Sequence, residues 1–117
     1  MIARLTTMLE SASAIVSRMG CYDGRNVFRK MVAAQFPELE LMAADLLPND
    51  TSTFIYADQR EWTLHRVLIA RNGNGKLVLD PYLPRELLRP YDPLDYQLIA
   101  CMNRGEAYLD NFSPFCD

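Results

Sequence analysis

The stretch TLHRVLIARNGNGKLVLDP, residues 63–81, decides the fold of this chain. Two largely apolar runs flank the sequence NGNG, and Asn-Gly between such runs is the strongest short-range signal of a β-hairpin. The stretch therefore predicts two antiparallel strands joined by a tight turn.

The residues before the hairpin predict helices first. Apolar side chains recur at helical spacing over residues 3–18 and again over residues 22–36, where Pro37 ends the second helix. The next segment, ELELMAADLL at 38–47, is ambiguous between helix and strand, and residues 48–50 predict a turn.

The rest of the chain predicts strands and one further helix. TSTFIYA at 51–57 is rich in β-branched and aromatic residues, which favours a strand. After a proline-punctuated loop, LDYQLIACMNR at 94–104 predicts a helix closed by Gly105, and the tail from 106 can add a short strand. Helices thus precede an antiparallel sheet, which is the α+β class, and residues 1–117 are expected to form one domain.

The composition excludes several classes of protein. Of the 117 residues, 50% are hydrophobic and 23% are charged, as in an ordinary globular domain. The formal net charge is −3 with Lys and Arg scattered along the chain, so no nucleic-acid partner is expected. No run is long enough for insertion into a membrane, and the N-terminal segment lacks the apolar core of a secretory signal. We therefore expect synthesis in a cytoplasm without a cleaved signal peptide, and export by another route stays open.

The cysteine pattern predicts neither disulfides nor a metal. The three cysteines, Cys21, Cys101 and Cys116, are odd in number and widely spaced, unlike a disulfide framework. No Cys-x-x-Cys pair or Cys/His cluster indicates zinc. Cys101 lies in the apolar run LIACM and is expected in the core, while Cys116 is one residue from the end.

The hairpin carries the only histidine, His65, and an aspartate, Asp80, at the end of its second strand. If residues 72–73 form the turn, His65 lies opposite Asp80. If residues 73–74 form it, Asp80 lies opposite Val67, diagonal to the histidine. In both registers the two side chains share one face, at roughly 5 to 8 Å between Cβ atoms. A carboxylate on one imidazole nitrogen leaves the other nitrogen to act as a base, although Asp-Pro also commonly just ends a strand.

Cys21 lies between Gly20 and Tyr22 at the predicted start of the second helix. A helix N-terminus and a neighbouring imidazolium both stabilise a thiolate. Gly20 would leave the backbone N–H groups around the cysteine open to a substrate carbonyl, as an oxyanion hole requires. The alternative is a semi-buried cysteine at a helix start, because thiols are commonly buried.

Three segments, GCYDGRNVFRKMV, EWTLHRVLIA and KLVLDPYL, follow one another between about residues 19 and 83. Together they resemble the papain-like Cys-His-Asp core of bacterial protein-glutamine deamidases, which include secreted protein-glutaminases and deamidating toxin or effector domains. In that family the nucleophile opens a helix in a Gly-Cys-Tyr-like segment. The base lies in an aromatic-x-x-His strand, and the acid lies in a hydrophobic-Asp-Pro segment. The separations here, 44 and then 15 residues, fit that order.

The resemblance implies a papain-like minimal core with helices packed on an antiparallel sheet. It implies that Cys21 is the nucleophile, His65 the general base and acid, and Asp80 the residue that orients the histidine. Trp62 matches the aromatic position before the histidine, where it would line the cleft or anchor the core.

The segment before the cysteine departs from the family pattern. Papain-like enzymes usually place a Gln or Asn there as a second oxyanion donor, whereas this chain has IVSRM at 15–19. Gly20 and Tyr22 flank the nucleophile as expected oxyanion or substrate-binding residues. The second donor is Ser17, a backbone N–H or a residue from elsewhere.

The implied reaction is a two-step acyl transfer at a glutamine carboxamide of a target protein, without metal or cofactor. A cysteine peptidase or amidase and a transglutaminase-like enzyme share its acyl-enzyme half, so both stay open. A non-catalytic binding module that happens to carry these residues is an alternative of another class. Family analogy also implies an effector that is secreted or injected into a target cell, with a cognate inhibitor or immunity protein as a further partner.

Overall fold

The computed structural model describes residues 1–103 and 105–114, and of Cys21 it describes the backbone alone. The elements, in chain order, are α1 (Ile2–Val16), α2 (Cys21–Gln35), β1 (Glu40–Pro48), β2 (Phe54–Ile55), β3 (Glu61–Trp62), β4 (His65–Asn72), β5 (Gly75–Leu79), the 3-10 helix η1 (Arg85–Leu87), α3 (Pro93–Ile99) and β6 (Ala107–Pro114). Two N-terminal helices therefore pack against an antiparallel sheet, and the predicted α+β class is confirmed.

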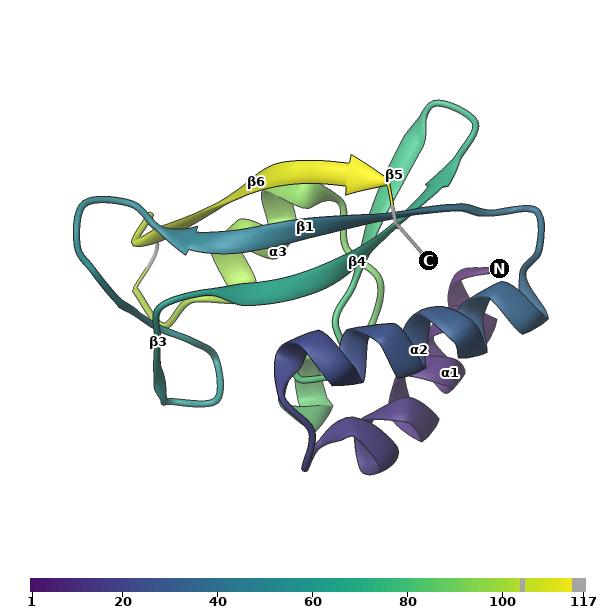
Figure 1. Ribbon diagram of the computed structural model, residues 1–117, viewed down its shortest axis with the longest axis horizontal. Coiled ribbons are helices and arrows are strands. Elements are labelled where there is room, and N and C mark those ends of the chain that lie inside the picture. The colour runs from purple at the N-terminus through teal and green to yellow at the C-terminus, as the bar shows by residue number, and fades with distance from the viewer. Residues whose placement is uncertain (104, 115–117) are drawn as a thin grey trace.

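The main sheet has four strands in the order β5-β4-β1-β6, and each neighbouring pair is antiparallel. β2 and β3 form a separate two-stranded ladder. Helices α1 and α2 lie side by side along the β4 side of the sheet, and α3 lies behind its strands in the view of Figure 1. The start of β4 is thus close to both α2 and the loops around α3.

Both predicted N-terminal helices are confirmed, with ends that differ by a few residues. The apolar stripe of α1 is buried from Leu5 to Val16, although Ile2 and Ile15 at its two ends are exposed. In α2 the side chains of Phe28 and Val32 are fully buried. These stripes explain why two helices form a layer on the sheet, since each has one apolar face to cover.

The hairpin adopts the second of the two predicted registers. Asn72 pairs with Gly75, so residues 73–74 form the turn. Gly73 has φ 63°, the positive value that the first central position of a II′ turn requires. Because the pairing continues through Leu68 and Leu79, the next residue, Asp80, lies diagonal to His65 on the same face.

The ambiguous segment at 38–47 forms the central strand β1. It pairs with β4 along one edge and with β6 along the other, and after Glu40 its residues on both faces are buried or half-buried. Its residues therefore lack the alternation of apolar and polar side chains that would have identified a strand. The strand predicted in the tail is also confirmed, as β6.

Two predicted elements were too long. Of the strand predicted over 51–57, only Phe54–Ile55 forms a strand, which pairs with β3, and Tyr56 adds an isolated bridge to Cys101. The helix predicted over 94–104 ends at Ile99, because the following backbone bonds to the β2 segment instead. The Ala57 N–H donates to the Ala100 carbonyl at 2.8 Å, and the Met102 N–H donates to the Ile55 carbonyl at 2.9 Å.

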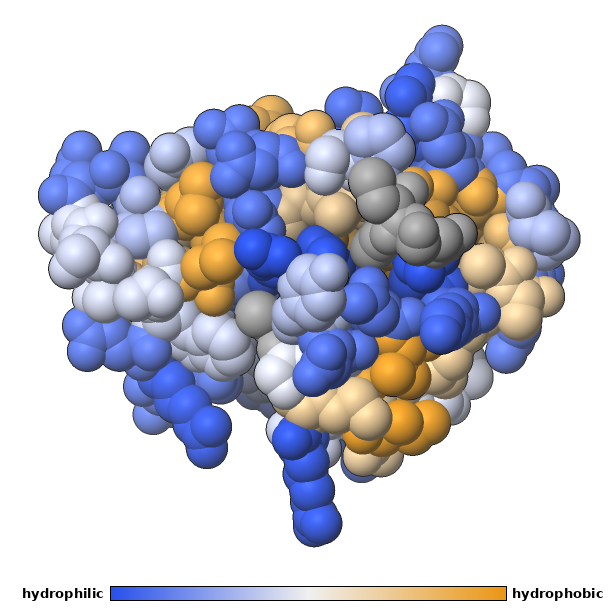
Figure 2. Space-filling view, in the orientation of Figure 1, coloured by the Kyte–Doolittle hydropathy of each residue, from blue (hydrophilic) through white to orange (hydrophobic). Residues whose placement is uncertain are grey.

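The interior is apolar apart from a few side chains. Of the described residues other than tyrosines, the buried polar ones are Arg25, His65 and Asp80, and two of these are the predicted catalytic pair. On the face shown in Figure 2, hydrophilic residues gather in the middle, between the sheet and α2. Over residues 1–103 and 105–114, no helix has the length and apolar character needed to cross a bilayer.

Candidate active site

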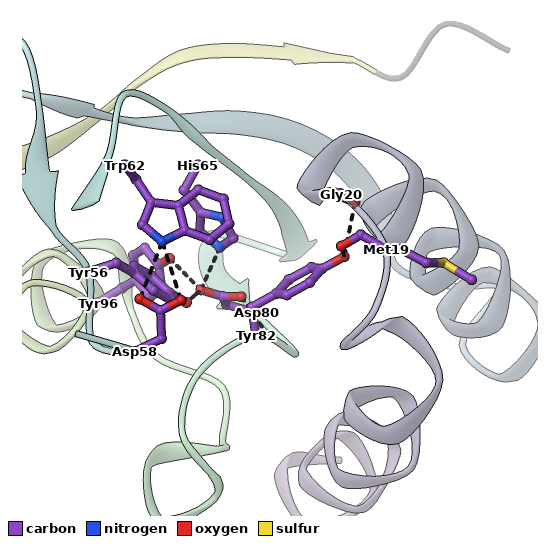
Figure 3. Close-up of polar contacts among 9 residues, drawn as sticks. All are labelled: Met19, Gly20, Tyr56, Asp58, Trp62, His65, Asp80, Tyr82 and Tyr96. Carbon is purple, nitrogen blue, oxygen red and sulfur yellow. Dashed lines mark hydrogen bonds and ion pairs between the residues drawn. The ribbon is translucent and has the colours of Figure 1, made fainter. Parts of the chain in front are cut away.

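His65 and Asp80 form a buried hydrogen-bonded pair. His65 opens β4 and Asp80 directly follows β5, so the hairpin register positions both. The distance from His65 Nε2 to Asp80 Oδ2 is 3.1 Å, and the two residues are 0% and 1% exposed (Figure 3). The contact that the sequence predicted from the hairpin is therefore present.

Asp80 receives hydrogen bonds at both of its carboxylate oxygens. The hydroxyls of Tyr56 and Tyr96 donate to Oδ2, the latter at 2.6 Å, and the backbone N–H of Tyr82 donates to Oδ1 at 2.9 Å. Burial works to raise the pKa of Asp80, but the charge of His65 and these side-chain hydrogen bonds outweigh it and hold the pKa below its ordinary value. The carboxylate is therefore ionised at neutral pH, and the imidazole Nε2–H donates to it.

The two tyrosines remain neutral donors. Burial, followed by the charge of Asp80, raises the pKa of Tyr56 and Tyr96 well above the ordinary tyrosine value. Tyr96 reaches the carboxylate of Asp80 because the N-terminus of α3 is fixed in position. Asp92 caps that helix by accepting a hydrogen bond from the Asp95 N–H at 3.0 Å, and Pro93 takes the first position.

Three aromatic rings enclose the imidazole of His65. The ring centroids of Tyr56, Trp62 and Tyr82 lie 4.6, 5.1 and 5.5 Å from that of the histidine, and the last two rings meet it edge-on. Trp62 is itself held through its Nε1–H, which lies 3.3 Å from both carboxylate oxygens of Asp58. Trp62 thus packs directly on the imidazole, and the orientation of His65 is fixed by rings as well as by Asp80.

Tyr82 links this pair to the start of α2. Its hydroxyl donates to the backbone carbonyls of Met19 and Gly20, each at 3.1 Å (Figure 3). The hydroxyl sits against Gly24, where a Cβ atom would lie only 1.7 Å from it. Helix α2 can therefore pack this closely against Tyr82 because residue 24 has no side chain.

Helix α2 begins at Cys21, one residue before the predicted range of 22–36, and Gly20 is its N-cap residue. The backbone N–H groups of the first turn of a helix have no partner within the helix, and they favour negative charge nearby. The side chain of Cys21 lies outside the described part of the structure. The structure does describe its backbone, which directly follows Gly20. The Gly20 carbonyl accepts a hydrogen bond from the Tyr82 hydroxyl.

The other predicted site residues lie around this helix start. A Cβ atom at Gly20 would meet nothing within 4 Å, so the space beside it is open. Tyr22 is 52% exposed, and the guanidinium groups of Arg25 and Arg66 lie over its ring. The Ser17 hydroxyl donates back to the Ala14 carbonyl of its own helix, at 3.5 Å.

Of the three cysteine side chains, the structure describes that of Cys101. Cys101 is buried, and burial, followed by the charge of Glu106, raises the pKa of its thiol to about 11. It is therefore a neutral thiol at physiological pH, in agreement with its predicted place in the core. Cys116 lies outside the described residues. Within the part that is described, no group of three or more His, Cys, Asp or Glu side chains is arranged to hold a metal ion.

Sequence reasoning missed the three tyrosines of the site. Tyr82 carried a usable signal, since it follows Asp80 by two residues in the segment DPY. Tyr56 and Tyr96 come from separate segments that reach Asp80 only in the folded chain.

Comparisons with protein-family models, with curated proteins and with solved structures gave no significant match to this chain. Function is therefore inferred from the residues of the site and their geometry.

Proposed function

We propose that this chain is a cysteine-dependent amidohydrolase with a papain-like core, which deamidates a glutamine side chain on a target protein. The supporting observation is the buried pair of His65 and Asp80, which Tyr82 joins to the helix start that carries Cys21. A base, its orienting carboxylate and a cysteine at a helix N-terminus are the parts that thiol acyl transfer needs.

The reaction starts with transfer of the Cys21 thiol proton to His65. Because Nε2 bonds to Asp80, the accepting nitrogen is Nδ1. The thiolate attacks the carboxamide carbon, and backbone N–H groups at the start of α2 stabilise the oxyanion that forms. His65 then protonates the departing amine, ammonia leaves and a thioester remains. Water gives a proton to His65 and attacks the thioester, which releases glutamate and restores the thiol.

Asp80 supports both steps without changing its own protonation. Its lowered pKa keeps it ionised, so it stabilises the imidazolium each time one forms. The donors from Tyr56 and Tyr96 hold the carboxylate in place, and its burial keeps it away from water.

The test combines ammonia release with intact-mass measurement on a glutamine-bearing protein. The wild-type chain should release ammonia and add about one dalton per site, through the acyl-enzyme route. Cys21→Ala should abolish both signals, while Cys101→Ala serves as the matched cysteine control and should retain them. Equal activity of wild type and Cys21→Ala would refute the mechanism.

The same mass spectra separate the related activities. Cleavage of the target chain would indicate a peptidase, and incorporation of an added amine would indicate a transglutaminase-like enzyme. Iodoacetamide labelling at mildly acidic pH addresses a non-catalytic module. An activated Cys21 is labelled fast in the wild-type chain and slowly in His65→Gln. Cys101, whose thiol pKa is raised, is labelled slowly in both proteins.

A further inference from the structure

A pocket of about 580 Å³ lies along the side of α2, on the face of the sheet opposite to that of Asp80. Helix α2 contributes residues spaced at i, i+3, i+4, i+7 and i+8, and three strands contribute the rest. We call this pocket the basic groove; its lining is Tyr22, Arg25, Asn26, Arg29, Lys30, Ala43, Asp45, Arg66, Asn111, Ser113 and Pro114.

The basic groove concentrates positive charge in a chain whose net charge is −3. Among the residues that the structure describes, its lining contains four cationic side chains, Arg25, Arg29, Lys30 and Arg66, and one carboxylate, that of Asp45. These cations are dispersed between positions 25 and 66, so the sequence showed no basic patch. The fold brings them together, and like charges held in one pocket favour an anionic occupant.

The carboxylate of Asp45 is already engaged within the groove. Asp45 lies 3.6 Å from the Nε of Arg66 and accepts a hydrogen bond from the Asn111 side chain at 3.3 Å. Asn111 has φ 57°, at a bulge where the pairing of β6 with β1 shifts. Bulges commonly re-aim a side chain beside a functional site, and here the bulge accompanies an amide that bonds inside the groove.

One end of the groove lies beside the helix start that carries Cys21. Tyr22 follows Cys21 in α2, and Arg66 follows His65 in β4. The guanidinium of Arg66 lies 5.1 Å from the centroid of the Tyr22 ring, so the two elements meet at this point. A substrate segment in the groove would therefore lie next to the residue that carries the nucleophile.

We propose that the basic groove binds an acidic segment of the target protein, adjacent to the glutamine that is deamidated. Guanidinium groups bind carboxylates in a bidentate way, and clustered cations raise the rate at which an acidic partner is captured. The position of the segment relative to the glutamine rests on the proposed function, whereas the binding of acidic peptide by the groove does not.

The test measures peptide binding by fluorescence anisotropy in the Cys21→Ala background, where no turnover occurs. One labelled peptide carries a glutamine flanked by Asp and Glu, and a matched peptide replaces these with Asn and Ser. The acidic peptide should bind at least about tenfold more tightly, and its affinity should fall as salt is raised. The double variant Arg29→Glu with Lys30→Glu should remove this preference.

Two further variants keep the result interpretable. Charge reversal of Arg60 and Lys76, both exposed and outside the groove, should leave the preference unchanged. The neutral double variant Arg29→Gln with Lys30→Gln should also lower the affinity for the acidic peptide. Thermal unfolding shows that each variant is folded.

Equal affinity for the two peptides, or an unchanged preference in the Arg29 and Lys30 variants, would overturn the proposal. So would a groove-dependent affinity for an RNA oligonucleotide alone, which would assign the groove to nucleic acid. An acidic peptide that binds as expected but yields no ammonia with the intact chain would refute the proposed deamidation and leave the groove assignment standing.

Discussion

His65 and Arg66 are consecutive residues of β4, yet they face opposite sides of the sheet and meet different surroundings. His65 is fully buried, with Asp80 at 3.1 Å and three aromatic rings around it. Arg66 is 35% exposed and lies 3.6 Å from Asp45, at the edge of the basic groove. Each residue thus has a carboxylate partner, one in the interior and one in contact with water.

Burial accounts for the difference between the two pairs. A buried polar pair is strong and costly to disturb, because its partners have no water to replace what is lost. An exposed pair is weak, since water and salt screen it, and it can exchange its partner for another anion. The buried side is suited to fixed proton transfer, and the exposed side is suited to recognition.

The largest expected effect comes from Asp80→Asn. Removing one charge of a buried pair should lower the free energy of unfolding by about 3 kcal/mol. It should also lower turnover by roughly a thousandfold or more, because the imidazolium loses its stabilising carboxylate. Urea unfolding and ammonia release measure the two effects. Unfolding indistinguishable from wild type would show that the pair is not desolvated.

Gly24→Ala should have the next largest effect. An exchange of Gly for Ala in a helix usually stabilises it by about 0.5–1 kcal/mol. Here the new Cβ would overlap the Tyr82 hydroxyl, so we expect a loss of about 1–3 kcal/mol, as in other overpacked sites. In a Tyr82→Leu background the same substitution should become nearly harmless. A loss that persists in that background would contradict the predicted overlap.

Acid should lower the free energy of unfolding, and part of this loss should depend on Asp80. Its pKa in the folded chain is below the ordinary value of 3.8, so its contribution to stability is full above that value. The contribution is lost as the pH falls through the lower folded-state pKa. Urea unfolding across this pH range should therefore show that acid lowers the free energy of unfolding less in Asp80→Asn than in wild type. Equal losses would contradict a lowered pKa of Asp80.

The smallest effect on stability is expected from Arg66→Gln. Exposed ion pairs contribute little, so the free energy of unfolding should change by less than about 1 kcal/mol. Binding of the acidic peptide should nevertheless weaken. A stability loss as large as that of Asp80→Asn would remove the contrast between the two sides of β4.

The hairpin shows what the sequence can predict. Local turn chemistry limited the pairing to a few registers, and two of them put His65 and Asp80 on one face. The apolar stripes of the first two helices could likewise be predicted from the sequence, as could the position of Cys21 at a helix start. All of these depend on neighbours within a short stretch of chain.

Features that depend on distant segments could not be read in this way. Tyr96 reaches Asp80 because α3 folds behind the sheet, and the predicted helix at 94–104 ended early because residues 100–102 bond to the β2 segment. The basic groove likewise combines side chains from α2 with residues of three strands. The spacing of apolar and polar residues within one helix or strand does not indicate such contacts between elements.

The hydrogen bonds of Tyr82 to Met19 and Gly20 also bear on when activity can arise. They span 63 and 62 positions of the chain, and Tyr96 lies later still. During translation the segment with Cys21 leaves the ribosome before the residues that hold His65. The proposed activity can therefore arise only after Tyr82 and Tyr96 have been synthesised and folded into place.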